Sequence, residues 1–290
     1  MEPVVSGPLA LLSLASGSSG NATYIGDDRS GVLVDAGIAA TRLLERLDGA
    51  GFNDAVIHAV LITHEHTDHV GGAAVLERRL ARRGQHPVFF ATAETWERTP
   101  SQALPSRREV VPVARPLHLG PWTVEAHAVP HDTPAPVAWT VERAGHRAGV
   151  LTDLGHTPDR ILQLATTLDV AAIELNHDVE RLMDGPYPWP LKQRIRGRLG
   201  HLSNLDGARL LRHAAQGRLR QAVLAHLSEQ NNTPELALAA AYTALAEGRC
   251  TLHVEVGSRE RATGPLIASQ TTSVPPPDSV RLSQPSLFDR

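Results

Sequence analysis

One short stretch constrains this chain of 290 residues more than any other, the sequence Thr63-His64-Glu65-His66-Thr67-Asp68-His69. It follows the apolar run 59–62, which is typical of a buried β-strand that ends at the cluster. Imidazole and carboxylate groups at the spacing H-x-H-x-D-H are suitable ligands for zinc, manganese or iron. Gly71 and Gly72 then let the backbone pass close to a bound ion and enter a helix. We therefore predict a metal site here, because a solvated polar loop rarely has this pattern.

The overall composition favours a folded protein in a reducing compartment. A hydrophobic content of 42% over 290 residues is sufficient for one large domain or two small ones. The single cysteine, Cys250, excludes an internal disulfide. No apolar run has the length of a membrane span, and the start Met1-Glu2-Pro3 lacks the basic residues of a signal peptide. We expect a cytoplasmic protein that does not contact a membrane.

The charge gives a mixed indication about nucleic acid. A net charge of −3 provides no overall basic field. All but one of the 28 basic residues are arginine, however, and arginine suits bidentate contacts with phosphate. The run Lys192, Arg194, Arg196 and Arg198 precedes His201. Both a solvated helix face and a phosphate contact are compatible with this run.

Hydrophobic periodicity predicts alternating strands and helices up to about residue 256. Strands are expected at 9–14, 23–25, 32–35, 56–62, 88–90, 168–175, 222–225 and 252–256, with further strands between 110 and 151. Helices are expected at 39–49, 72–83, 93–98, 191–199, 205–215 and 234–247. Four strands end at a potential ligand: His131, Asp153, Glu174 and His226. Taken alone, an Asp at a strand end is usually a turn residue.

Several of these stretches resemble the metallo-β-lactamase superfamily, and within it the YycJ/WalJ group of DNA exonucleases, which is related to RNase Z, RNase J and PhnP. The resemblance is carried by residues 14–21, 63–70, 174–178, 200–204 and 226–228. It implies an α/β (α+β) fold, the four-layer αββα sandwich, over residues 1–262. It also implies two divalent metal ions, Mn²⁺ or Zn²⁺, at the edges of the sheets.

The resemblance further implies which residues bind metal. The predicted ligands are His64, His66 and His131 for one ion, Asp68, His69 and His226 for the other, and Asp153 between them. We expect Asp35 to support the site from behind and His127 to be an ordinary histidine on a strand face. His156 has at most a minor claim to a role at the site.

Other residues are expected to act on the substrate. Asp68 could also orient the nucleophile, and His201, held by Glu174, could act at the leaving oxygen. Alone, His201 before a helix cap would be structural, and the loop 16–21 would be an ordinary hairpin turn. The predicted substrate contacts are Ser16, Ser18, Asn21, His177 and Arg194.

The last residues, 263–290, are rich in Pro, Ser and Thr, which predicts a disordered tail. Near its end, Gln284-Pro285-Ser286-Leu287-Phe288 resembles the peptide by which bacterial replication and repair proteins bind the sliding clamp. An accidental match within a tail is the alternative.

Together these features predict a two-metal phosphodiesterase, a 5′ exonuclease that acts on single-stranded DNA or duplex ends in repair or replication. A small-molecule hydrolase of the same fold, either a PhnP-like cyclic phosphodiesterase or a thioester hydrolase, would fit the near-neutral charge. It would not explain the arginines beside His201 or the clamp-like peptide. An inactive clamp-bound scaffold is a third possibility, against which the complete set of ligands argues.

Overall fold

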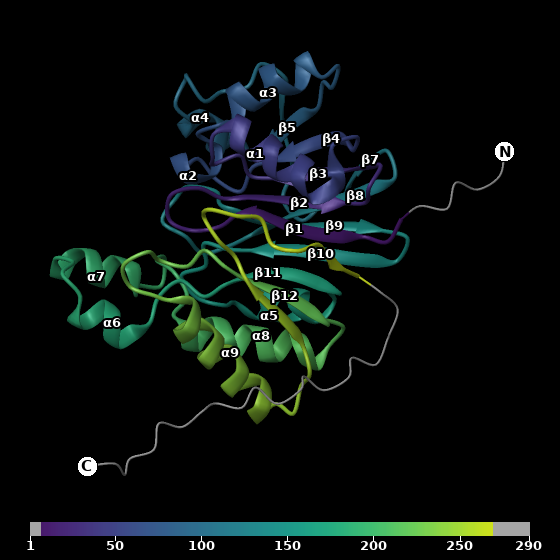
Figure 1. The fold of residues 1–290 in the computed structure, drawn as a ribbon. Helices are drawn as coiled ribbons and strands as arrows, with labels where there is room; N and C mark the ends of the chain where they lie inside the picture. The colour runs from purple at the N-terminus through teal and green to yellow at the C-terminus, as the bar shows by residue number, and fades with distance from the viewer. Residues whose placement is uncertain (1–6, 269–290) are drawn as a thin grey trace, which may run out of the picture.

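The computed structural model describes residues 7–268, in which two seven-stranded sheets pack face to face and helices cover both outer faces (Figure 1). This is the predicted four-layer αββα sandwich. The layers are stacked from top to bottom in Figure 1, with α1 and α3 at one end of the stack and α8 and α9 at the other.

The first sheet contains most of the N-terminal strands. Its spatial order is β14 (Leu266–Ile267), β1 (Ala10–Ala15), β2 (Ala22–Gly26), β3 (Ser30–Val34), β4 (Val56–Leu61), β5 (Val88–Ala91) and β6 (Arg108–Val110). Strands β14 to β3 are antiparallel to their neighbours, whereas β3 to β6 are parallel.

The second sheet is built from the middle and the C-terminal part of the chain. Its order is β13 (His253–Val256), β12 (Gln221–Ala225), β11 (Val170–Glu174), β10 (His146–Leu151), β9 (Val137–Arg143), β8 (Trp122–Ala128) and β7 (Leu117–Leu119). Strands β10 to β13 are parallel, and β7 to β10 are antiparallel.

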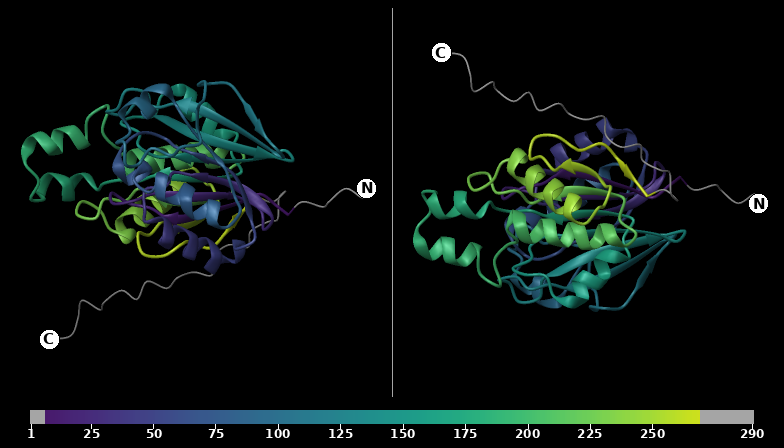
Figure 2. Two further views of the ribbon diagram at one scale, coloured as in Figure 1. Left: turned by 90° about the horizontal axis from the view of Figure 1, so that it is seen from above. Right: turned by 90° about the horizontal axis from the view of Figure 1, so that it is seen from below.

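The helices of the first half are α1 (Ala40–Leu47), the π-helical turn η1 (Asp48–Phe52), α2 (Thr67–Val70), α3 (Ala73–Arg82) and α4 (Ala93–Arg98). Those of the second half are α5 (Asp159–Thr166), α6 (Val179–Asp184), α7 (Trp189–Ile195), α8 (Asn204–Gln216) and α9 (Pro234–Glu247). The short α6 and α7 project from one end of the sandwich (Figures 1 and 2).

Three apolar clusters separate the four layers. Alternate strand residues point to opposite faces, so Leu11 and Val34 pack between the sheets while Leu12 and Leu33 pack against α1 and α3. The third cluster joins the outer face of the second sheet to α5, α8 and α9. Because both faces of each sheet are covered, the central strands are buried along almost their whole length.

The strand directions bring several loops to one edge of the sandwich. In the first sheet, β3 and β4 run parallel, so the segments after them meet at the same end. In the second sheet, β8, β10, β11 and β12 all point the same way. The carboxyl ends of parallel strands are the usual place for a ligand in such sheets.

The described structure continues past residue 262, the predicted end of the domain. Leu266 and Ile267 form β14, which pairs with Ala10 and Leu11 of β1, and Leu266 is 1% exposed. The short apolar run was hidden in a Pro-, Ser- and Thr-rich context, where composition alone predicts a tail. The clamp-like peptide 284–288 lies outside the described residues. Within residues 7–268, no helix combines the length and the apolar composition needed to cross a membrane.

Candidate metal centre

The structure brings all seven predicted metal ligands together at the edge where the strand ends meet. Four overlapping groups of donors each have ligand atoms within 4.8 Å of one another. The groups are His64, His66 and His131; His64, His69 and Asp153; Asp68, His69 and His226; and Asp153, Glu174, His201 and His226. Donors from both sheets therefore lie at one place, the arrangement that the family resemblance implied.

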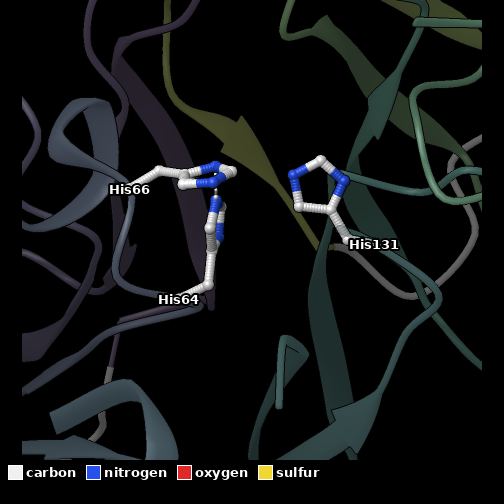
Figure 3. Close-up of side chains that lie close together, drawn as sticks. All are labelled: His64, His66 and His131. Atoms are coloured by element: carbon white, nitrogen blue, oxygen red, sulfur yellow. Dashed lines mark hydrogen bonds between the residues drawn. The ribbon is translucent and has the colours of Figure 1, made fainter. Parts of the chain in front are cut away.

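The first group combines residues that follow strands of the two different sheets. Figure 3 shows His64 and His66 on the segment that follows β4, with His131 opposite them on the segment that follows β8. The Nε2 atom of His64 lies 3.0 Å from Nδ1 of His66. Three imidazoles that converge from two elements are a common way to hold a transition-metal ion.

Asp153 lies between this group and the second one. Its Oδ2 atom is 3.4 Å from Nε2 of His69, and its Oδ1 atom is 3.8 Å from Nε2 of His131 and 3.5 Å from Nε2 of His226. The Oδ2 atom of Asp68 lies 3.4 Å from Nε2 of His69 and 3.6 Å from Nε2 of His226. Asp153 is therefore within reach of both groups of donors.

The outer nitrogens of three of these histidines are fixed by the protein. Nδ1 of His69 lies 2.7 Å from Oδ2 of Asp35, and Nδ1 of His226 lies 3.1 Å from Oε1 of Glu174. Nδ1 of His131 donates to the carbonyl oxygen of Gly200 at 3.0 Å. Such contacts orient an imidazole so that Nε2 faces the ion. Asp35 thus supports the site from behind, as expected.

Three residues at the ends of the strands have left-handed backbone conformations. Asp35, Asp153 and His226 have φ angles of 63°, 59° and 57°. This region is costly for residues other than glycine, and it is found where the surroundings enforce it. Each strand turns sharply at the residue that carries the functional group, which places the side chain over the strand end.

Close backbone packing positions the loop that contains Asp68. A methyl group on Gly37 would lie 1.6 Å from the carbonyl oxygen of Asp68, so only glycine fits there. The same carbonyl oxygen accepts a hydrogen bond from the backbone N–H of Asn21 at 2.8 Å. The histidine-rich loop is therefore held by the segments after β1 and β3.

The electrostatics of the site reflect its many carboxylates. Burial opposes charge on His69, but Asp153, Asp35 and Asp68 outweigh this effect and raise its pKa well above the ordinary value. Burial likewise opposes charge on Asp153, yet His226 and His69 lower its pKa well below the ordinary value. Burial and the neighbouring His69 lower the pKa of His64. The buried carboxylates thus stabilise a nearby positive charge, which protonated histidines provide in the absence of a bound ion.

The donor atoms at the centre fit a divalent metal. The buried atoms Nε2 of His131, Nε2 of His226 and Oδ2 of Asp153 have no hydrogen-bond partner among the described residues. Unpartnered buried polar atoms are costly, so their convergence needs an explanation. A cation bound by neutral imidazoles and ionised carboxylates would satisfy all of them.

His201 and Glu174 form a pair beside the donors. Nδ1 of His201 lies 2.8 Å from Oε1 of Glu174, which is fully buried. The other carboxylate oxygen accepts from the backbone N–H groups of Leu154 at 2.9 Å and Leu202 at 3.2 Å. Burial would raise the pKa of Glu174, but His201 and the hydrogen bonds lower it to about 2. Glu174 is therefore an ionised support for His201.

A cavity of about 240 Å³ opens above these groups. Among the predicted residues, His66, Asp68, Asp153, His201 and His226 line it, as do Ser18 and Arg194. The proposed metal donors thus face the same space as two of the predicted substrate contacts.

Three other predicted substrate contacts do not line this cavity. Oγ of Ser16 accepts from the backbone N–H of His226 at 2.7 Å, and Asn21 bonds to Gly17 at 3.0 Å and Asp68 at 3.4 Å. His177 is 1% exposed and does not line the cavity. Ser16 and Asn21 instead contact residues that carry predicted metal ligands, because the Ser/Gly-rich loop packs against the histidine-rich loop. His127 contacts Thr140 at 3.0 Å, and His156 contacts Arg198 at 3.0 Å, both outside the donor cluster.

The sequence interpretation missed two residues in the cavity. Asp132 lines it with Oδ1 at 3.3 Å from Nε2 of His131, and its other oxygen accepts from Arg194. Asn176 donates to the carbonyl oxygen of His226 at 2.9 Å. Both are adjacent in sequence to residues that had been singled out. This adjacency in the sequence was the feature that could have indicated a role for them at the site.

Comparison with known proteins agrees with this geometry. A family model described as a beta-lactamase superfamily domain matches residues 31–227. The chain belongs to the beta-lactamase superfamily. It is 34% identical over 266 residues to a protein named exodeoxyribonuclease WalJ of Streptococcus pneumoniae, covering 90% of this chain and 96% of the relative. It is 35% identical to exodeoxyribonuclease YycJ of Bacillus anthracis, covering 77% of this chain and 84% of that one.

A solved structure of a metallo-beta-lactamase fold protein has a similar fold. The metallo-beta-lactamase fold protein YhfI from Bacillus subtilis matches with a TM-score of 0.65 at 17% identity, covering 89% of this chain and 100% of the other. The predicted resemblance to the superfamily and to the YycJ/WalJ group is confirmed.

Proposed function

We propose that this superfamily member is a metal-dependent exodeoxyribonuclease that removes nucleotides from the 5′ end of DNA. The observation that carries the proposal is the His/Asp donor cluster beside a cavity that is also lined by Arg194 and by His201, which Glu174 holds from behind. The relatives named exodeoxyribonuclease, which align with 77–90% of the chain, supply the substrate class.

The cofactor in this proposal is a pair of divalent ions, Mn²⁺ or Zn²⁺. His64, His66 and His131 would hold one ion, Asp68, His69 and His226 the other, and Asp153 would be shared. The mixed nitrogen and oxygen donors suit either metal. When bound, such ions activate a water molecule and neutralise the charge that develops on a phosphate.

The chain's own residues would then complete the reaction. Asp68, half-exposed at the cavity, would orient the attacking water. Glu174 holds Nδ1 of His201, so Nε2 is the nitrogen that can pass a proton to the leaving oxygen. Arg194 would bind a phosphate of the entering strand, since its side chain is 60% exposed at the rim.

The test is digestion of labelled DNA by the purified full-length protein. Single-stranded and duplex oligonucleotides with a 5′ or a 3′ label would be incubated with Mn²⁺, Zn²⁺ or EDTA. We expect release of labelled mononucleotide from the 5′ end only, and no product in EDTA. Intact DNA, together with turnover of a cyclic nucleotide or a thioester, would instead support the small-molecule hydrolase.

A further inference from the structure

One wall of the cavity is an apolar stripe on α7 and the loop before it. Tyr187, Leu191 and Ile195 all line the cavity; Leu191 and Ile195 lie one turn apart on α7, and Tyr187 lies in the loop that precedes it. All three are only partly buried, although many of the other lining residues are polar or charged. Hydrolysis of a phosphate makes no use of such a surface. The stripe therefore points to an apolar or aromatic part of the substrate.

The stripe is held firmly relative to the site. The buried Lys192 of α7 donates to the carbonyl oxygen of Met183 in α6 at 2.5 Å. The backbone N–H of His201 donates to the carbonyl oxygen of Ile195 at 2.8 Å. The projecting pair α6 and α7 (Figures 1 and 2) is thus fastened directly to the histidine beside the donors.

A positive charge lies next to the stripe. Arg194 lines the same cavity and donates through Nε to Asp132 on the opposite wall. Its two terminal nitrogens make no hydrogen bond to another described residue, which leaves them free for a phosphate. Apolar surface, guanidinium and metal donors therefore face one space, and a nucleotide has a part that suits each of them: a base, a phosphate and the scissile bond.

We propose that Tyr187, Leu191 and Ile195 form the subsite for an unpaired nucleotide at the 5′ end of a DNA strand, whose base and deoxyribose pack on the stripe while Arg194 binds its phosphate. This proposal rests on the proposed function. Stacking on an aromatic ring tolerates any base, which suits a nuclease without sequence preference. A cavity of about 240 Å³ is closer in size to one nucleotide than to a base pair, so we expect a paired end to open before it enters.

The experiment combines changes in the protein with changes in the DNA. The metal-loaded full-length protein would cleave a 5′-phosphorylated single strand whose terminal nucleotide either has its base or is an abasic analogue. For the wild type, we expect KM to be about tenfold higher with the abasic end. Tyr187→Ala should raise KM for the intact end by a similar factor, with no further increase for the abasic end. Tyr187→Phe should retain the wild-type discrimination.

The matched control is Tyr242→Ala, because Tyr242 is a 52% exposed tyrosine on α9, remote from the cavity lining. It should leave both KM values unchanged. An equal rise in KM for both ends in Tyr187→Ala would contradict the subsite, since the loss would then be independent of the base.

A binding measurement separates this proposal from the proposed function. Fluorescence anisotropy in EDTA would compare the two labelled ends without cleavage. Cleavage of DNA with the same KM for the intact and the abasic 5′ end would overturn the subsite alone. Discrimination in binding without any cleavage would overturn the nuclease function alone, and the absence of both would overturn the two together.

Discussion

At the scale of single residues, three ligands were assigned because they follow strands and match the motifs of the family that the chain resembles. His131, Asp153 and His226 follow buried strands, and the structure places all three within one cluster. Asp132 and Asn176 could not be assigned, because their importance comes from contacts with Arg194 and His226, 62 and 50 residues away. Local pattern contains no information about such pairs.

Asp68 is the residue whose loss should affect activity most while affecting the fold least. Asp68→Ala removes a donor from the cavity floor, so we expect the rate on DNA to fall by at least about a hundredfold. Thermal unfolding in EDTA should shift by less than about 4 °C, because the loop is not part of the core. Asp54→Ala, in an exposed turn, is the control. Comparable losses of stability and activity would indicate that the cluster is structural.

His177 should make the protein sensitive to acid. Burial lowers its pKa from 6.5 to about 4, so the folded state disfavours the proton that the unfolded chain accepts. The contribution of neutral His177 to the free energy of unfolding is complete above pH 6.5 and is lost as the pH falls towards 4. The total loss is at most about 3 kcal/mol. We expect His177→Gln to lose less unfolding free energy over this interval than the wild type. Urea titrations in EDTA at several pH values would measure it, and parallel curves would refute the assignment.

At the scale of elements, periodicity identified most of the strands and helices, including the eight-residue α1 and the six-residue α4. Helices α5 and α6, which have the same lengths, were not predicted. The order of strands within each sheet also cannot be read from local pattern. The resemblance to a known fold implied the four layers but gave no strand order.

The junction between β3 and α1 should be intolerant of any side chain at Gly37. Gly37→Ala would push a methyl group into the backbone at Asp68, so the metal loop must move. We expect activity to fall at least about tenfold and the unfolding free energy to fall by about 1–3 kcal/mol. Gly49→Ala is the matched control, because nothing lies within 4 Å of the added methyl group. A fully active Gly37→Ala variant would show that the loop position is not critical.

At the scale of the whole molecule, the sequence predicted one folded domain up to residue 262 and a tail after it, and the described structure includes one strand beyond that residue. The strand β14 closes the first sheet beside β1, a pairing between residues more than 250 positions apart. A segment of two paired residues has no signature that distinguishes it from a polar tail.

Removal of residues 284–288 should separate catalysis from recruitment. If the peptide binds a sliding clamp, its deletion should abolish binding to the purified bacterial clamp and leave the cleavage of free DNA unchanged. Surface plasmon resonance and the digestion assay would measure the two effects. No detectable binding by the full-length protein would eliminate this interaction.

The central claim is that donors from both sheets hold a pair of cations at one edge of the sandwich. The most direct measurement is the metal content of the full-length protein purified without chelators, determined by mass spectrometry alongside His226→Ala. We expect about two transition-metal ions per chain in the wild type and clearly fewer in the variant. Fewer than one ion per chain in the wild type, or an unchanged content in His226→Ala, would contradict the account.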